Sequence, residues 1–256
     1  MTQSAKARDF TALHIKGQPV VIYNIWDAGT AGAVAKAGAK ALATGSASVA
    51  AAHGFDDGQT IPLAFLADIV AHITDGTDLP VSVDFEGAYA EAPDEAAANV
   101  ARIIAAGAIG INFEDQLIGA DKQLHDIPSQ QARIRAIRAR AGADFFINAR
   151  TDLFLQQRDA TQHAGMIDAA IARGKAYAEA GASGFFVPGL TDLALIQKVT
   201  AAVPLPVNIM MSPRTPPILD LAKVGAARVS HGPFPYYELM GVLEERARAV
   251  FGGASP

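Results

Sequence analysis

The stretch AGAIGINF, residues 106–113, joins the end of a predicted helix to the start of a predicted strand. Gly107 suits the end of a helix because glycine reaches the left-handed conformation at no steric cost. The apolar run that follows is typical of a buried strand. The same Gly-Ala pattern precedes other apolar runs: AGAKALAT (37–44), AGADFFIN (141–148), AGASGFFV (180–187) and VGAARVS (224–230). The chain therefore repeats one helix-to-strand unit.

Three further apolar runs complete the set: PVVIYNIW (19–26), LPVSVDF (79–85) and LPVNIMM (205–211). The runs lack a clean two-residue alternation, which is typical of strands buried on both faces of a parallel sheet. Helical patterns separate them at residues 28–37, 62–74, 94–106, 128–141, 163–180, 192–201, 216–224 and from about 235 onward.

Eight β/α units in about 250 residues predict a (β/α)8 barrel. The alternative, an open doubly wound sheet, is disfavoured because no G-x-G-x-x-G follows the first strand. We expect one barrel domain over residues 1–256, with an N-terminal segment at 1–18 and a C-terminal helix and tail at 234–256.

Composition limits the partners. The net charge of −5 argues against nucleic acid as a partner. The absence of cysteine excludes disulfides, thiolate metal ligands and a cysteine nucleophile. No run approaches the ~18 apolar residues of a membrane helix, and the polar N-terminus lacks the core of a signal peptide. We expect a cytoplasmic protein with a small-molecule substrate. The basic stretch ARIRAIRAR (132–140) predicts a solvated helix face.

Acidic residues gather where the third and fourth strands end. Asp84 and Glu86 follow one apolar run, and Glu114 ends the next. In barrels of this type the chemistry lies at the carboxyl ends of the strands. Hard oxygen ligands without nearby cysteine or histidine suit a divalent cation such as Mg²⁺. The alternative is that these acids pair with Arg150 or cap the next helices.

Arg150 ends the fifth apolar run, in FFINARTD. Its guanidinium suits recognition of a carboxylate or phosphonate; the alternative is a structural ion pair with Glu114 or Asp152. Ser46, in ATGSAS, suits an anion-binding turn, with a plain turn as the alternative. No lysine ends a strand, which disfavours a Schiff-base mechanism.

The segments VSVDFEGAY (81–89), GINFEDQ (110–116), NARTD (148–152) and PVNIM (206–210), in this order, resemble the isocitrate lyase/phosphoenolpyruvate mutase superfamily. The segment ATGSASVAAAHGFDDGQ (43–59) is also similar, so the resemblance covers residues from about Ile22 to Pro233. It implies a Mg²⁺ ion at Asp84, with Mn²⁺ as an alternative. Glu86 and Glu114 would hold the ion's waters, and Asp56 would lie close to it.

The resemblance also implies the roles of the substrate-binding residues. Ser46 and the Ala47 backbone N–H would hold the substrate carboxylate, and Arg150 the oxygen-rich group next to it. Asn208 would lie near the distal end of the substrate, and Trp26 would form part of the floor. The implied reaction passes through an enolate of pyruvate type, formed when a bond β to a ketone breaks.

The loop at residues 116–127 departs from the superfamily pattern. The lyases carry a proton-donating cysteine here and the phosphonate enzymes an asparagine, and this chain has neither. It offers Asp121, Lys122, Gln123 and His125 as proton donors, of which His125 titrates nearest neutral pH. We therefore expect a Mg²⁺-dependent carbon–carbon lyase acting on a small 2-oxo or 2-hydroxy (di)carboxylate, by oxaloacetate decarboxylation or isocitrate-type cleavage. The alternatives are a phosphonomutase or phosphonate P–C bond enzyme and a 2-oxo-acid binding protein without turnover.

The superfamily commonly forms dimers of dimers that exchange a C-terminal helix. FPYYELMGVLEERARAVF (234–251) has the apolar positions for such an exchange, so we expect a homo-oligomer, a dimer or a tetramer. The alternative is that this helix closes its own barrel.

Overall fold

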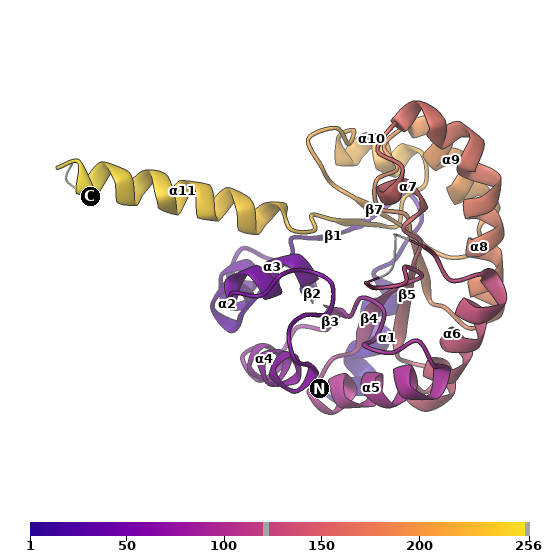
Figure 1. Cartoon of the computed structure of the whole chain (residues 1–256), viewed down its shortest axis with the longest axis horizontal. Coiled ribbons are helices and arrows are strands. Elements are labelled where there is room, and N and C mark those ends of the chain that lie inside the picture. Colours follow the sequence, from indigo (N-terminus) through magenta and orange to yellow (C-terminus); the bar gives the residue numbers. More distant parts are fainter. Residues whose placement is uncertain (120–122, 254–256) are drawn as a thin grey trace.

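The computed structural model describes residues 1–119 and 123–253. Its eight strands form one parallel sheet in the order β1-β8-β7-β6-β5-β4-β3-β2, as expected for a (β/α)8 barrel (Figure 1). The strands are β1 (Val20–Ile22), β2 (Leu42–Ala43), β3 (Val81–Asp84), β4 (Gly110–Glu114), β5 (Phe146–Arg150), β6 (Gly184–Phe186), β7 (Val207–Met210) and β8 (Arg228–Ser230). The predicted fold class is confirmed.

The barrel is nearly closed between its first two strands. Here the residues that follow β1 and β2 share a single parallel bridge, between Ile25 and Thr44, instead of a ladder. The Ile25 N–H donates to the Ala43 carbonyl at 2.9 Å, and the Gly45 N–H donates to the Ile25 carbonyl at 3.3 Å. This seam lies directly before Ser46.

Helices surround the strands. They are α1 (Gln3–Ala12), α2 (Ala28–Lys36), α3 (Ser46–Ala52), α4 (Leu63–Asp75), α5 (Pro93–Ala105), α6 (Ile127–Ala141), α7 (Leu153–Gln156), α8 (Ile167–Glu179), α9 (Leu193–Ala202), α10 (Ile218–Lys223) and α11 (Phe234–Phe251), with a 3-10 helix η1 (Ala160–Met166) before α8. The helices predicted between strands are confirmed to within a few residues, except that η1 forms the start of the segment predicted at 163–180. The sequence patterns did not reveal α1, α3 and α7.

Helix α1 covers the amino-terminal end of the barrel. Its Phe10 is fully buried and packs edge-on against Phe146, with ring centroids 5.1 Å apart. His14, just after the helix, stacks on the same Phe146 ring at 4.3 Å. The expected N-terminal segment is thus an ordered plug.

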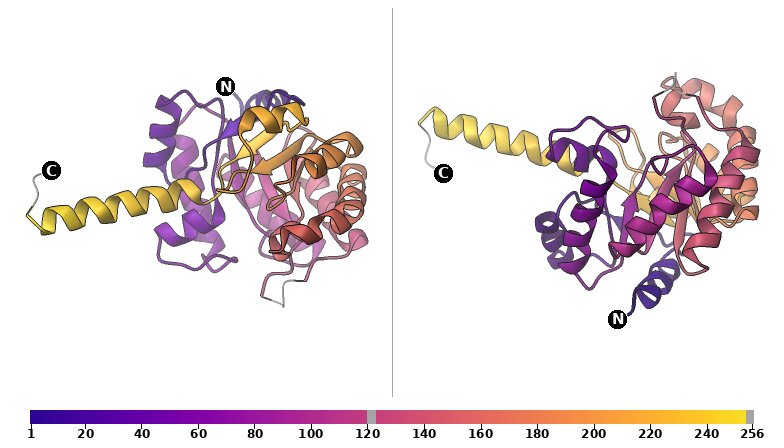
Figure 2. Two further views of the ribbon diagram at one scale, coloured as in Figure 1. Left: turned by 90° about the horizontal axis from the view of Figure 1, so that it is seen from above. Right: turned by 60° about the horizontal axis from the view of Figure 1, so that its bottom comes forward.

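Helix α11 extends away from the barrel that it follows (Figures 1 and 2). Its apolar side chains are largely exposed, including Tyr237 at 53%, Leu243 at 60% and Phe251 at 88%. The alternative in which this helix closes its own barrel is therefore wrong. No helix in the described part of the chain is long and apolar enough to cross a membrane.

Candidate active site

The predicted acids meet at one end of the barrel because their strands are parallel neighbours. Asp84 ends β3 opposite Asn112 of β4, and Glu114 ends β4 opposite Arg150 of β5. Glu86 follows β3 after one buried residue. All these side chains lie at the carboxyl ends of the strands, where barrels of this type carry their sites.

Asp84 accepts hydrogen bonds from three donors on two sides. The Ser46 N–H and hydroxyl both donate to Asp84 Oδ2 at 3.1 Å, and Asn112 Nδ2 donates to Oδ1 at 3.3 Å. Asn112 in turn accepts from Asn148 at 2.8 Å. The carboxylate is thus held in place by the start of α3 and by a row of amides inside the barrel.

Arg150 forms the ion pairs with Glu114 and Asp152 that the sequence analysis gave as an alternative to substrate binding. Its Nη1 lies 2.8 Å from Glu114 Oε2 and 3.9 Å from Asp84 Oδ1, and its Nη2 donates to Asp152 Oδ2 at 2.9 Å. Burial acts to lower the pKa of Arg150, but the Asp152 and Glu114 carboxylates raise it above its ordinary range. Arg150 is therefore a permanent cation held among the acids.

The acids outnumber this cation. Glu86 accepts from the backbone N–H groups of Gly58 and Gln59, both at 2.9 Å. Burial, followed by repulsion from Asp57 and Asp84, nevertheless raises the pKa of Glu86 to about 8. Burial likewise raises the pKa of Glu114 despite its pairing with Arg150. The mouth of the barrel therefore holds more carboxyl groups than Arg150 can neutralise, and a bound cation would favour their ionised form.

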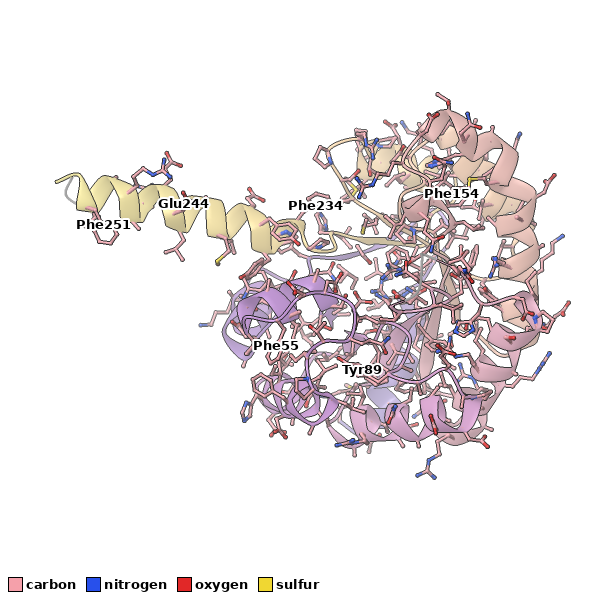
Figure 3. The ribbon with its side chains drawn as sticks, viewed as in Figure 1. Phe55, Tyr89, Phe154, Phe234, Glu244 and Phe251 are labelled. Atoms are coloured by element: carbon pink, nitrogen blue, oxygen red, sulfur yellow. The ribbon has the colours of Figure 1, made fainter. Side chains whose placement is uncertain are left out.

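The backbone beside Glu86 is strained. Among the described residues, positive φ outside glycine occurs only at Gln59 (61°), Glu86 (49°), Ala88 (59°) and Tyr89 (56°). These residues contact each other, since the Gln59 side-chain oxygen accepts from the Tyr89 N–H and the Gln59 N–H donates to Glu86. Tyr89 is labelled in Figure 3. Such strain persists only where the surrounding structure enforces it, and it is common at functional sites.

Arg133 helps to hold this loop, contrary to the prediction of a solvated helix face. It is 2% exposed, and its Nη2 donates to the carbonyls of Gly87 at 2.6 Å and Ala90 at 2.8 Å. Its guanidinium also lies over the Phe113 ring, 4.6 Å from the centroid. The other arginines of that stretch are at least partly exposed. Helical spacing gave no sign that this one arginine points inward.

Two adjoining cavities occupy the mouth. The first has a volume of about 200 Å³ and is lined by Asn24, Gly45, Ser46, Ala47, Asp57, Asp84, Asn112, Arg150, Leu155, Phe186, Met210, Ser230, Gly232 and Pro233. The second, of about 180 Å³, is lined by Ser46, Asp57, Gly58, Glu86, Glu114, Gln116, Ile118, Arg150, Asp152, Leu155 and Gln156. The shared residues Ser46, Asp57, Arg150 and Leu155 make them one hollow with room for a small molecule.

The acids suit a hydrated Mg²⁺ ion. In residues 1–119 and 123–253, no three His, Asp or Glu side chains form a ready ligand cluster. Mg²⁺ usually takes only one or two protein carboxylates and keeps several waters. Asp84, as one direct ligand, with Glu86 and Glu114 acting through water, would fit that habit, and the surplus of carboxyl groups over cations suits a metal ion.

The other predicted residues lie at different distances from this hollow. Ala47 lines the first cavity, and Asp56 lines a smaller one with Asp84 and Glu86. Asn208 is buried and accepts from the hydroxyl of Ser230, which lines the first cavity, at 3.1 Å. Trp26 is also buried and packs edge-on against Tyr236. Neither Asn208 nor Trp26 lines the cavities described here.

Among the expected proton donors, Asp121 and Lys122 lie outside the described residues. His125 is half-buried and lines neither cavity; burial and the nearby Arg133 lower its pKa. Sequence reasoning missed Asp57, which lines both cavities and repels Glu86. The signal was present as the paired acids of FDDGQ, of which only Asp56 was chosen.

Comparisons with known proteins identify the family to which the chain belongs. The family model described as phosphoenolpyruvate phosphomutase matches residues 10–251. A solved structure from Burkholderia cenocepacia J2315, provisionally named a phosphonomutase, is 47% identical with a TM-score of 0.92, over 99% of this chain and 100% of that one.

Two curated relatives are more distant. The uncharacterized protein Rv1998c of Mycobacterium tuberculosis is 35% identical, over 95% of this chain and 89% of its own length. The 2-methylisocitrate lyase of Escherichia coli K12 is 30% identical, over 92% and 80%. The chain belongs to the phosphoenolpyruvate phosphomutase family, within the isocitrate lyase/phosphoenolpyruvate mutase superfamily.

Proposed function

We propose that this chain is a Mg²⁺-dependent carbon–carbon lyase that acts on a small 2-oxo or 2-hydroxy (di)carboxylate. The observation that carries the proposal is the arrangement of the mouth: Asp84 lines the cavity of about 200 Å³, Glu86 and Glu114 line the adjoining cavity of about 180 Å³, and Arg150 and Ser46 line both. The excess acids suit a cation, and the cation and donors beside them suit an anionic substrate.

Each group then has a role in binding. Asp84, Glu86 and Glu114 would hold the metal, directly or through water, with Asp56 and Asp57 adding negative charge nearby. The Ser46 hydroxyl and the Ala47 backbone N–H would hold the substrate carboxylate. Arg150 would face the neighbouring oxygen-rich group, and its pairs with Glu114 and Asp152 fix its orientation.

The reaction can be written for oxaloacetate. The C3–C4 bond breaks, C4 leaves as CO₂, and the electron pair forms an enolate between C2 and C3. C3 then takes one proton and pyruvate results. Arg150 is a fixed cation that stabilises charge developing next to it, more strongly in the transition state than in the ground state. When bound, Mg²⁺ would supply a Lewis acid for the same charge.

This choice of bond rests on what each reaction needs. Decarboxylation requires no protein acid for the departing CO₂, so it tolerates the absence of cysteine. His125 remains our proposal for the proton that C3 takes, and it would have to approach the hollow to deliver it.

A second candidate is cleavage or migration of a phosphonate P–C bond. The names of the matching family model and of the 47% identical structure favour it. The same acids and Arg150 would serve it. Against it, residues 116–127 contain no asparagine like the one in the phosphonate enzymes' loop.

A proton-NMR time course tests the proposal. Oxaloacetate, isocitrate, 2-methylisocitrate and phosphonopyruvate are each incubated with Mg²⁺, with EDTA in its place, and without enzyme. We expect pyruvate from oxaloacetate at a rate above its unaided decay, or glyoxylate or pyruvate from the isocitrates, only when enzyme and metal are both present. Product from phosphonopyruvate alone would establish the second candidate. Oxalate binding without any product would indicate a binding protein.

We also propose that the chain assembles with copies of itself through α11. The helix leaves its own barrel with apolar side chains exposed (Figure 3), which is costly in water. Exchange with a neighbouring copy would bury them. Sedimentation velocity should show a dimer or tetramer, and truncation after Pro233 should reduce it to monomers or insoluble protein.

A further inference from the structure

One buried carboxylate beside the site takes no part in the proposed reaction. Asp115 follows Glu114 at the end of β4, is fully buried and lines neither of the two cavities of the mouth. Two side chains one turn apart on α8 hold it: Arg173 Nη1 lies 2.9 Å and the Tyr177 hydroxyl 2.7 Å from Asp115 Oδ2. Burying a carboxylate is unfavourable unless it is paired and hydrogen-bonded, so α8 compensates the charge that the fold keeps here.

The other carboxylate oxygen of Asp115 contacts the chain segment that carries Arg150. Asp115 Oδ1 accepts from the Asp152 backbone N–H at 3.0 Å, and the Asp115 N–H donates to the Arg150 carbonyl at 3.1 Å. The Asp152 side chain in turn accepts from Arg150 Nη2 at 2.9 Å. A continuous series of contacts therefore runs from α8, through these two aspartates, to the guanidinium of Arg150.

Arg173 also contacts the chain ten residues beyond Asp115. Its Nη1 donates to the His125 carbonyl at 2.9 Å, and the His125 N–H donates to the Asp115 carbonyl at 2.7 Å. This part of the chain has a further bridge of its own, between Gln116 and Leu124, and so depends on Arg173 only in part. For Asp115, by contrast, Arg173 is the one basic partner within residues 1–119 and 123–253. The loss of Arg173 should therefore be felt mainly through Asp115.

We infer that Arg173 is a positioning residue for Arg150. The inference rests on the proposed function, in which Arg150 faces the oxygen-rich group of the substrate. By fixing Asp115, Arg173 keeps Asp152 in the place from which it orients the Arg150 guanidinium. A misplacement of about 1 Å in a group that stabilises a transition state can cost about 100-fold in rate, so a contact outside the cavities can control activity.

Two variants on α8 test the inference. Oxalate binding with Mg²⁺ is measured by titration calorimetry, and kcat/KM with the substrate that the NMR panel identifies. Arg173→Gln removes the charge that compensates Asp115, and we expect both quantities to fall by about tenfold, the lower end of what the loss of supporting contacts costs. Tyr177→Phe keeps the buried ring and removes one hydroxyl, so it should fold even if Arg173→Gln does not. It should lower both quantities by about threefold, as expected for one hydrogen bond.

Arg138→Gln is the matched control. Arg138 lies on α6, is half-buried like Arg173, and donates to the carbonyls of Gly181 at 2.9 Å and Phe145 at 2.6 Å, just before β6 and β5 at the other end of the barrel. Its loss should lower the melting temperature but leave oxalate affinity and kcat/KM within about twofold of wild type, because distant sites act independently. Amide hydrogen exchange at Asp152 should be faster in Arg173→Gln and unchanged in Arg138→Gln.

A double variant shows whether Arg173 acts through Arg150. In an Arg150→Lys background, Arg173→Gln should lower kcat/KM by less than about twofold further, because the fork that it positions is already gone. The same loss in both backgrounds, or wild-type values in folded Arg173→Gln and Tyr177→Phe, would overturn the inference and leave the proposed function standing. If the wild-type protein did not bind oxalate with Mg²⁺, the proposed function itself would fail. Unchanged exchange at Asp152 in Arg173→Gln would then overturn the inference as well.

Discussion

The two ends of strand β5 lie in opposite environments. At its amino-terminal end, Phe146 packs against Phe10 and His14 in an apolar plug. Four residues later, Arg150 lies among Asp84, Glu114 and Asp152. The plug is held by packing of aromatic rings, whereas the mouth concentrates like charges and strained backbone. Stability and chemistry are thus separated along the same strands.

Arg228 marks the boundary between the two ends. It is fully buried on β8, its Nε donates to Ser230 Oγ at 3.0 Å, and its guanidinium lies 5.7 Å from the centre of the Phe10 ring. Ser230 lines the cavity, while Phe10 belongs to the plug. Burial lowers the pKa of Arg228 to about 10, which leaves it charged at neutral pH.

The largest effect on stability should come from the plug. Phe10→Ala removes a fully buried ring and should lower the free energy of unfolding by about 3–5 kcal/mol. Urea denaturation measures the loss. At temperatures where the variant is folded, kcat/KM should stay within about twofold of wild type. A folded variant that had lost activity would contradict the separation of the two ends.

Asp84→Asn, at the mouth, should reduce activity and leave stability nearly unchanged. It keeps the shape of the side chain but removes the charge proposed to bind the metal, so kcat/KM should fall by about 100- to 1,000-fold. The melting temperature should change little, because the variant relieves repulsion among buried acids. Asp144→Asn, at the exposed Arg8 pair outside the mouth, is the control and should retain full activity.

Arg150→Lys tests geometry separately from charge. Lysine keeps a positive charge but cannot reproduce the fork that contacts Glu114 and Asp152 together. We expect a loss of about 10- to 100-fold in kcat/KM, with a folded barrel by circular dichroism. Wild-type kinetics in this variant would mean that Arg150 supplies charge alone.

His14 should make the plug sensitive to acid. Burial, assisted by the Arg228 charge, lowers the pKa of His14 to about 3. The unfolded chain binds this proton near pH 6.5, so between about pH 6.5 and 3 it holds more protons than the folded chain does. Stability therefore falls as pH drops, with a contribution of about 1.4 kcal/mol per pH unit. Between pH 7 and 5 the urea midpoint should depend less on pH in His14→Phe than in the wild-type protein. His72→Phe, which alters an exposed histidine, should show the wild-type pH dependence.

The sequence predicted the repeating part of the molecule well, because each β/α unit carries its own local signals. Gly107 has φ of +95° at the end of α5, as the Gly-Ala pattern indicated. The plug was missed because α1 is polar along most of its length and buries only Ala7 and Phe10. Helix α3 was missed because Ser46–Ala52 is short and rich in alanine, with no amphipathic pattern.

The acids and Arg150 at the site were predictable because strand ends must meet in a parallel barrel. The apolar residues that line the cavity were not, because Phe186 and Met210 look like ordinary strand residues until the register places them at the mouth. Which acid of Asp56 and Asp57 faces the cavities also depends on loop conformation, and a one-residue difference has no signature in spacing.

The seam between β1 and β2 should determine where the barrel opens locally. A single bridge at Ile25 and Thr44 is the least secured part of the ring, so opening there should require less free energy than opening of any full ladder. Amide hydrogen exchange at Ile25 and Gly45 should then be faster than in β4 and β5. Because Gly45 precedes Ser46, each such opening also loosens the group proposed to hold the substrate carboxylate. A bound ligand that contacts Ser46 would thus stabilise the seam between β1 and β2. Its binding should slow amide hydrogen exchange at Ile25 and Gly45.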